Sequence, residues 1–203
     1  MLCELPIQEN VPRETFLKLK QYQAILLKWQ KAVNLISHKD IDQVWHRHVL
    51  DSLQLIDYLQ PGSILDIGSG GGFPGMVLAI ATKHTVSLVD SDQKKCIFLE
   101  EVKSELKLAN LKICNTRIEN LNIAEKFQNI TARAFSSLQK TLQLSTPLLN
   151  PLGQYLFFKG SSYKQELEEA LSIYKFGYEV IESRTDKSGV ILRMKYKADG
   201  QAN

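Results

Sequence analysis

The stretch Ser63–Gly75, which reads Ser-Ile-Leu-Asp-Ile-Gly-Ser-Gly-Gly-Gly-Phe-Pro-Gly, decides the fold of this chain. It opens with a short apolar run that is typical of a strand buried in a parallel sheet. Glycines follow, and Pro74 with the apolar run 76–81 then predicts the first turns of a helix. Strand, glycine turn and helix in this order predict a nucleotide-binding corner, because glycine permits positive φ and lets a ligand lie against bare main chain.

The spacing of these glycines limits which nucleotide the corner can hold. A P-loop requires Lys and then Ser or Thr after its last glycine, whereas Met76 follows here. The dinucleotide pattern Gly-x-Gly-x-x-Gly fails from Gly68 but matches over Gly70–Gly75, which leaves NAD or FAD open. The spacing Asp-x-Gly-x-Gly-x-Gly over Asp66–Gly72 is that of S-adenosylmethionine-dependent methyltransferases. We prefer it because its glycines begin where the strand ends, although a surface loop without a ligand stays an alternative.

Length and composition set outer bounds on the class of protein. The chain has 203 residues, of which 44% are hydrophobic and 23% charged, which suits one globular domain with an appendage. Its formal charge of +3 permits a nucleic-acid partner without arguing for one. The cysteines, Cys3, Cys96 and Cys114, are far apart, which argues against a disulfide framework or a zinc site. Neither a membrane helix nor a signal pattern is present, so we expect a cytoplasmic protein without membrane contact.

Residues 1–60 are expected to form an N-terminal helical extension to a domain over residues 61–203. One helix begins near Pro12 and carries apolar residues at three- and four-residue steps. A second helix follows Asp40 as its N-cap and ends before Pro61-Gly62. On that helix Arg47 and Asp51 are spaced to form an ion pair, and the alternative is that Arg47 or His48 touches substrate. His46 and His48 are two residues apart and cannot chelate one metal ion, so we expect no metal site.

Beyond the glycine turn, strands and helices alternate along the chain. Apolar, β-branched runs predict strands at 85–89, 111–114, 129–134 and 154–158, and amphipathic runs predict helices at 93–108, 138–149 and 163–174. The last two strands, 178–181 and 190–194, have no helix between them and are expected to form a hairpin. This pattern predicts an α/β fold with a Rossmann-like sheet of seven strands, the last antiparallel.

Several strands end in residues that suit a charged nucleoside. Because ligands of open α/β sheets lie outside the carboxyl ends of the strands, these ends are expected to form one pocket. Asp90, followed by Ser91, ends the second strand and can accept hydrogen bonds from ribose hydroxyls. Ile118-Glu119 follows the third and offers an apolar surface and an acceptor for adenine. Arg133 and Lys159 end the fourth and fifth strands and add positive charge.

In these and a few further residues, the chain resembles the family of 16S ribosomal RNA guanine-N7 methyltransferases, also called glucose-inhibited division protein B. The resemblance runs from about Asn34 to Lys195, and its most specific marks are Phe73-Pro74-Gly75 and Arg133-Ala134-Phe135. Further marks are Asn34-Leu35, Arg47-His48, Asp51-Ser52 and the run Asp66–Gly72. It implies a class I methyltransferase fold with S-adenosylmethionine as methyl donor. The implied donor contacts are Gly68, Phe73, Ile118, Glu119 and Arg133, with Asp90 near the ribose, and we add Gly70 and Ser91.

The chemistry implied by this family fits the residues at the strand ends. Guanine N7 carries an exposed lone pair, so it can attack the methyl group without losing a proton, and no catalytic base is expected. Positioning alone can supply ~7–11 kcal/mol. The fourth strand ends in Arg133–Ser136 rather than in the Asp/Asn-Pro-Pro-Tyr motif of exocyclic amine methylation. We expect Phe135 to stack on the target base, and Arg47, His48 and Lys159 to grip RNA phosphates.

The expected partner is therefore 16S rRNA or the 30S subunit, bound by a monomeric enzyme. Three other functions remain open on the sequence alone. The match over Gly70–Gly75 allows an NAD- or FAD-dependent oxidoreductase. A small-molecule methyltransferase would share the donor pocket, and a non-catalytic RNA-binding assembly factor would use the same surface without transfer.

Overall fold

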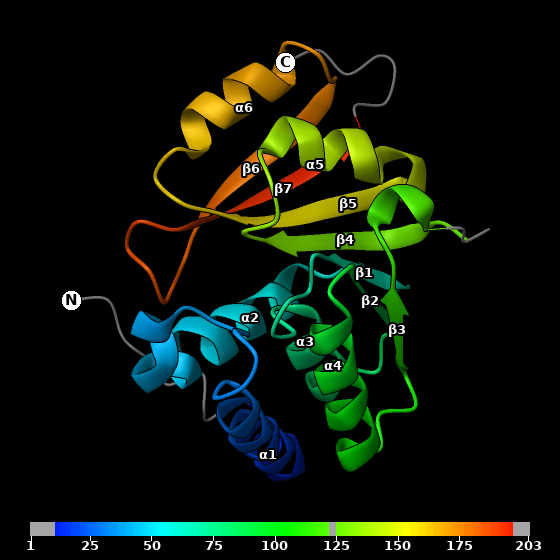
Figure 1. Ribbon diagram of the computed structural model, residues 1–203. Helices are drawn as coiled ribbons and strands as arrows, with labels where there is room; N and C mark the ends of the chain where they lie inside the picture. Colours follow the sequence, from blue (N-terminus) through cyan, green and yellow to red (C-terminus); the bar gives the residue numbers. More distant parts are fainter. Residues whose placement is uncertain (1–10, 122–124, 197–203) are drawn as a thin grey trace.

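The computed structural model describes residues 11–121 and 125–196, which form a sheet covered by helices on both faces (Figure 1). Cys3 and the first ten residues of the predicted extension lie outside the described residues. The sheet has seven strands in the order β3-β2-β1-β4-β5-β7-β6, and β7 runs antiparallel to both of its neighbours. The predicted Rossmann-like sheet with an antiparallel last strand is confirmed. The strands are β1 Ile64–Ile67, β2 Val86–Asp90, β3 Leu111–Asn115, β4 Phe127–Arg133, β5 Leu149–Lys159, β6 Phe176–Glu182 and β7 Val190–Tyr196.

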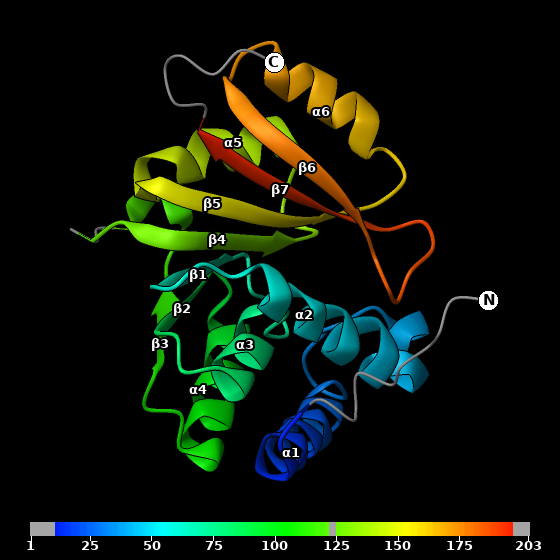
Figure 2. The same cartoon turned by 180° about the vertical axis from the view of Figure 1, so that it is seen from behind.

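The helices divide between the two faces of the sheet (Figures 1 and 2). Helices α1, α3 and α4 lie on one face, and α5 and α6 lie on the other. Successive side chains of β1 point to opposite faces of the sheet. Ile64 packs in the core under α3 and α4, and Leu65 packs in the core under α5 and α6. The helices are α1 Arg13–Trp29, α2 Asp51–Leu53, α3 Gly75–Ala81, α4 Gln93–Leu106, α5 Leu138–Ser145 and α6 Tyr163–Leu171.

The N-terminal extension packs directly on the sheet domain. Helix α1 follows Pro12 as predicted, and its buried residues Leu19, Tyr22 and Leu26 share one core with α3 and α4. The second predicted helix is a chain of short pieces: a 3-10 turn over His38–Gln43, a π-helical turn over Trp45–Leu50, α2, and a 3-10 turn over Gln54–Tyr58. The domain boundary after residue 60 stays a prediction.

The prediction that Asp40 caps the second helix is wrong. Asp40 lies inside the 3-10 turn rather than before a helix, and its carboxylate is 3.3 Å from the Nε of Arg47. Asp40 is buried, and a buried carboxylate requires a paired charge, which Arg47 supplies. The residue therefore links two turns of the extension instead of starting one.

The glycine turn between β1 and α3 requires glycine for two different reasons. Gly68 and Gly70 have φ values of +66° and +54°, in the left-handed region that favours glycine. Gly75, the first residue of α3, is required by close packing, because a Cβ there would lie 2.2 Å from Leu88 Cδ2. Its backbone N–H donates to Asp66 Oδ2 at 3.3 Å, which ties the start of α3 to β1.

Two further findings concern what the fold does not offer. Within residues 11–121 and 125–196, no helix combines the length and apolar character needed to cross a bilayer. Over the same ranges, no cluster of three or more His, Cys, Asp or Glu side chains is placed to hold a metal ion.

Candidate functional site

A cavity of about 280 Å³ opens where the carboxyl ends of β1, β2 and β4 meet the turn after β3. We call it the glycine cavity; it is formed by residues 67–68, 89–91, 116–119 and 134–135. The structure therefore brings together six residues that the sequence placed at one site from four separate stretches: Gly68, Asp90, Ser91, Ile118, Glu119 and Phe135.

Asp90 fixes the shape of the glycine cavity. Its Oδ2 accepts a hydrogen bond from the backbone N–H of Gly70 at 2.8 Å, and its Oδ1 accepts one from the N–H of Asp92 at 2.9 Å. These bonds join the end of β2 to the glycine turn and hold the carboxylate in one orientation. A carboxylate has about four acceptor positions, so Asp90 can still accept hydrogen bonds from a bound ribose.

The remaining walls of this cavity suit an adenosine group. Ile118 is buried and apolar, whereas Glu119, the next residue of the same 3-10 turn, is exposed and can accept from an amino group. Phe135 packs against the turn on the other side, and a Cβ at Gly68 would lie 2.4 Å from its ring. Bare backbone, apolar surface and two carboxylates are what the nucleoside of S-adenosylmethionine requires, so the residues present fit this cofactor.

Phe73 lies beneath the glycine turn rather than in the glycine cavity. Its ring is buried, stacks on the imidazole of His48 with centroids 4.8 Å apart, and lies 5.4 Å from the ring of Tyr22. The hydroxyl of Tyr22 donates to the carbonyl of Gly71 in the same turn. Phe73 therefore supports the cofactor turn from below.

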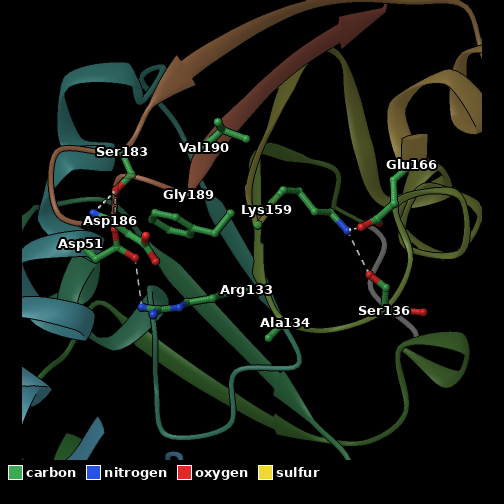
Figure 3. Close-up of a pocket in the computed structure, with 12 residues that line it drawn as sticks. Asp51, Arg133, Ala134, Ser136, Lys159, Glu166, Ser183, Asp186, Gly189 and Val190 are labelled. Atoms are coloured by element: carbon green, nitrogen blue, oxygen red, sulfur yellow. Dashed lines mark hydrogen bonds and ion pairs between the residues drawn. The ribbon is translucent and has the colours of Figure 1, made fainter. Parts of the chain in front are cut away.

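Arg133 lines a second cavity, which has a volume of about 300 Å³ and lies at the ends of β4 and β5 and the start of β7 (Figure 3). We call it the arginine cavity. It is lined by residues 51, 133–134, 136, 158–160, 166, 183, 186 and 189–190. Ala134 lines both cavities, so the two are adjacent. Figure 3 shows Arg133 and Asp51 on one side of the arginine cavity, and Lys159 with Glu166 on the other.

Each cation of the arginine cavity is paired with a carboxylate. Arg133 Nη1 lies 3.1 Å from Asp51 Oδ2, and Lys159 Nζ lies 2.8 Å from Glu166 Oε2. Burial lowers the pKa of Arg133, and the charge of Asp51 acts in the opposite direction. The ion pairs hold both cations at fixed positions along the edge of the sheet.

The predicted ion pair between Arg47 and Asp51 is wrong. Asp51 pairs with Arg133 instead, and Arg47 lies 3.3 Å from Asp40 and 3.5 Å from Asp186. Arg47 and Asp51 are four residues apart, but the intervening turn is π-helical, so the spacing of an α-helix does not apply.

His48 does not lie on the rim, where the sequence placed it. Its side chain is buried, and burial, followed by the charge of Arg133, lowers its pKa from 6.5 to about 4. The imidazole is therefore neutral at pH 7 and packs on Phe73. It has neither the charge nor the exposure that a contact with an RNA phosphate requires.

The residues that hold Asp51 in place could not be identified from the sequence. Its Oδ1 accepts hydrogen bonds from Gln54 Nε2 at 2.7 Å, Ser183 Oγ at 3.0 Å and Thr185 Oγ1 at 2.5 Å. The two hydroxyls come from the connection between β6 and β7, which reaches the short helices of the extension in Figure 1. The polar run Ser183–Gly189 marks a turn in the sequence, but nothing in it indicates a partner more than a hundred residues away.

Comparison with known proteins identifies the family. The family described as rRNA small subunit methyltransferase G matches residues 16–189 of this chain. A relative named ribosomal RNA small subunit methyltransferase G, from Gluconobacter oxydans, is 42% identical over 186 residues, which cover 91% of this chain and 95% of the relative. The chain belongs to this family. A relative of the same name from Orientia tsutsugamushi is 40% identical over 193 residues, or 94% of this chain and 96% of the relative.

Solved structures of more distant proteins share the class I methyltransferase fold of this chain. An S-adenosylmethionine-dependent methyltransferase from Clostridium acetobutylicum superposes with a TM-score of 0.61 at 15% identity, over 88% of this chain and all (100%) of that one. The glycopeptide N-methyltransferase MtfA, solved with S-adenosylmethionine, gives 0.61 at 10% identity, over 74% of this chain and 94% of that one. Family membership, rather than glycine spacing, thus decides for a methyltransferase over an NAD- or FAD-dependent oxidoreductase.

Proposed function

We propose that this member of the methyltransferase G family transfers the methyl group of S-adenosylmethionine to N7 of a guanine in 16S rRNA. The observation that supports it best is the glycine cavity, in which Gly68, Asp90, Ile118 and Glu119 meet at the strand ends of a class I methyltransferase sheet. The family match covers these residues and both cavities, apart from the final lining position.

Bound S-adenosylmethionine supplies a methyl group on a positively charged sulfur, ready for attack by a lone pair. We assign Asp90, Ser91 and Glu119 to its ribose and adenine edges, and Ile118 to an adenine face. Gly68 and Gly70 leave bare backbone beside it, because their positive φ values are strained for residues with a Cβ. Phe73 acts from beneath the turn, and Arg133 lines the arginine cavity beside Ala134, the residue that lines both cavities.

The reaction requires the protein to position the two reacting groups, and it requires no proton transfer. The N7 lone pair forms the new N–C bond while the C–S bond breaks, and no proton leaves the base. Holding the two reacting atoms in line can supply ~7–11 kcal/mol of the barrier. His48 agrees with this scheme, because it stacks on Phe73 and lines neither cavity, so the structure gives it no contact with the reacting atoms.

For RNA contact we retain three of the residues predicted from the sequence. Phe135 is partly buried on the wall of the glycine cavity and can stack on a base. Arg47 and Lys159 can contact phosphates, although each is paired with a carboxylate in this structure. We further propose that the enzyme acts as a monomer in the cytoplasm, on naked 16S rRNA or on the 30S subunit.

Donor binding and product identity test this function separately. Calorimetric titration is expected to show S-adenosylmethionine binding to the wild-type protein, and binding weakened more than tenfold in Gly68→Ala. Transfer of tritiated methyl groups to 30S subunits, and to naked 16S rRNA, is then measured in parallel. Donor binding without transfer to either RNA would contradict the proposal and favour a non-catalytic assembly factor.

A further inference from the structure

The arginine cavity is next to the donor site but is not needed to hold the nucleoside. Ala134 lines both cavities, with Phe135 on the glycine side and Arg133 on the arginine side. A methyl acceptor has to approach the donor from an adjacent space, and the arginine cavity is such a space. Its volume of about 300 Å³ falls within the range of small-molecule sites and is large enough for one purine base.

One carboxylate of this cavity is fixed in place yet still able to accept hydrogen bonds. Asp186 Oδ1 accepts from the backbone N–H of Ser188 at 2.9 Å and from its hydroxyl at 2.7 Å. These bonds lower the pKa of Asp186, so the group is ionised at neutral pH. The other oxygen, Oδ2, lies 3.5 Å from Arg47 Nη2, and no hydrogen bond to it is formed by residues 11–121 or 125–196.

The walls of the arginine cavity away from Asp186 are partly apolar. Phe158 and Val190 contribute apolar surface, and the Arg133 guanidinium lies 5.7 Å from the centre of the Phe158 ring. Asp186 itself has a side chain that is 40% exposed, so an incoming group can reach it without unfolding the β6–β7 connection. A flat base with hydrogen-bond donors on one edge matches these walls.

We propose that the arginine cavity receives the target guanine, and that Asp186 selects it by accepting hydrogen bonds from its N1–H and 2-amino groups. This inference rests on the proposed function and adds the acceptor subsite to it. Guanine presents two donors side by side on this edge, and the two acceptor positions of Asp186 Oδ2 can accept them together, since Oδ1 is already occupied by Ser188. Adenine presents the N1 lone pair there instead, and the carboxylate repels it.

The same contact leaves the reacting atom free. In guanine, N7 lies across the ring system from N1 and the 2-amino group, so a base held by Asp186 has its N7 edge open to the donor. Enzymes that modify bases commonly extrude them and read their Watson–Crick edge in this way. Methylation makes the base positively charged, because N7 gains a methyl group and loses no proton. The ionised Asp186 therefore also stabilises the charge that develops during transfer.

The test pairs Asp186→Asn with Asp57→Asn as its control. Asp57 pairs with Arg184 at 2.8 Å, so it anchors the same β6–β7 connection, but it lines neither cavity. Donor affinity is measured by calorimetry, and kcat/KM is measured on the rRNA that the wild-type enzyme modifies. We expect Asp186→Asn to lower kcat/KM by about 10–100-fold, since a hydrogen bond to a charged group is lost. Donor affinity of both variants, and kcat/KM of Asp57→Asn, are expected to stay within about twofold of wild type, less than 0.5 kcal/mol.

A substituted RNA separates base reading from a structural role. Inosine lacks the 2-amino group of guanine but keeps N7, so placing it at the modified position removes one of the two proposed hydrogen bonds. The wild-type enzyme is expected to lose about tenfold in kcat/KM on the inosine RNA, and Asp186→Asn to lose little further.

Equal loss from inosine in both proteins, or none in the wild type, would overturn the inference even if Asp186→Asn were unstable. Absence of guanine methylation by the wild-type enzyme would instead refute the proposed function.

Discussion

Asp51 and Asp57 of the N-terminal extension each form an ion pair with an arginine of the sheet domain, and the structure predicts very different consequences when each of these pairs is broken. Asp51 pairs with Arg133 at 3.1 Å, and Asp57 pairs with Arg184 at 2.8 Å. The first pair is largely buried, with side chains 8% and 20% exposed, whereas the second is open to solvent, at 54% and 50%. Replacing each aspartate by asparagine keeps the side-chain shape, removes the charge and turns one acceptor oxygen into an N–H donor. The remaining oxygen can still accept the hydrogen bonds that Asp51 Oδ1 receives.

The expected magnitudes follow from burial. Removing one partner of a buried ion pair costs about 3–5 kcal/mol, because the other charge is left uncompensated. Since Arg133 keeps a fifth of its side chain exposed, the lower end applies, and Asp51→Asn should cost about 3 kcal/mol. Exposed pairs contribute about 0.2–1 kcal/mol, which is the cost expected for Asp57→Asn.

Thermal unfolding followed by circular dichroism gives the comparison. For a chain of this length 1 kcal/mol corresponds to about 2–4 °C, so Asp51→Asn is expected to lower Tm by about 6–12 °C and Asp57→Asn by at most about 4 °C. Urea unfolding of the same proteins checks that the two-state slope is unchanged. Equal shifts in the two variants would refute the reasoning, because they would show that burial does not set the strength of these pairs.

Three further predictions concern the turn that carries the cofactor. Alanine at Gly68 or Gly70 should each cost about 1–2 kcal/mol for positive φ, but only Gly68→Ala also displaces the Phe135 ring, so its Tm should be the lower of the two. Tyr22→Phe removes the hydroxyl that donates to the turn, and urea unfolding should show a loss of about 0.5–1.5 kcal/mol; no loss would contradict the contact. Burial raises the pKa of Asp66 to about 7, so its folded form prefers the proton. Relative to Asp66→Asn, wild-type stability should therefore be highest below about pH 4 and fall by roughly 4 kcal/mol as pH rises to 7; a flat difference would contradict the shift.

The sheet could be predicted from sequence because buried parallel strands read as short apolar runs. β1 coincides with the apolar run before the glycines, and β2 begins and ends within about one residue of the predicted range 85–89. The strand-end residues meet because parallel strands end at one edge of the sheet. β5 begins at Leu149, five residues before the predicted start at residue 154. The prediction started late because Pro151 and Gly153 indicate a break in a strand. Pairing with β4 carries the strand across that break, with a shift in register.

The contacts of the arginine cavity could not be predicted, and the reason is physical. Local spacing paired Arg47 with Asp51, but the turn between them is π-helical, and Arg47 pairs with Asp40 and Asp186 instead. The true partner of Asp51 is Arg133, which becomes its neighbour only after the extension packs across the sheet. His48 looked like a surface cation, yet the stacking that buries it involves Phe73 from the glycine turn. Such contacts depend on tertiary packing, which sequence periodicity does not encode.

The most direct measurement is the identity of the methylated nucleoside. The purified protein is incubated with 30S subunits or naked 16S rRNA and labelled S-adenosylmethionine, the RNA is digested to nucleosides, and the label is located by liquid chromatography with mass spectrometry. The structure and the family predict a single labelled product, 7-methylguanosine, from small-subunit rRNA. Label on an exocyclic amine, on another base or on a small molecule would contradict the central claim.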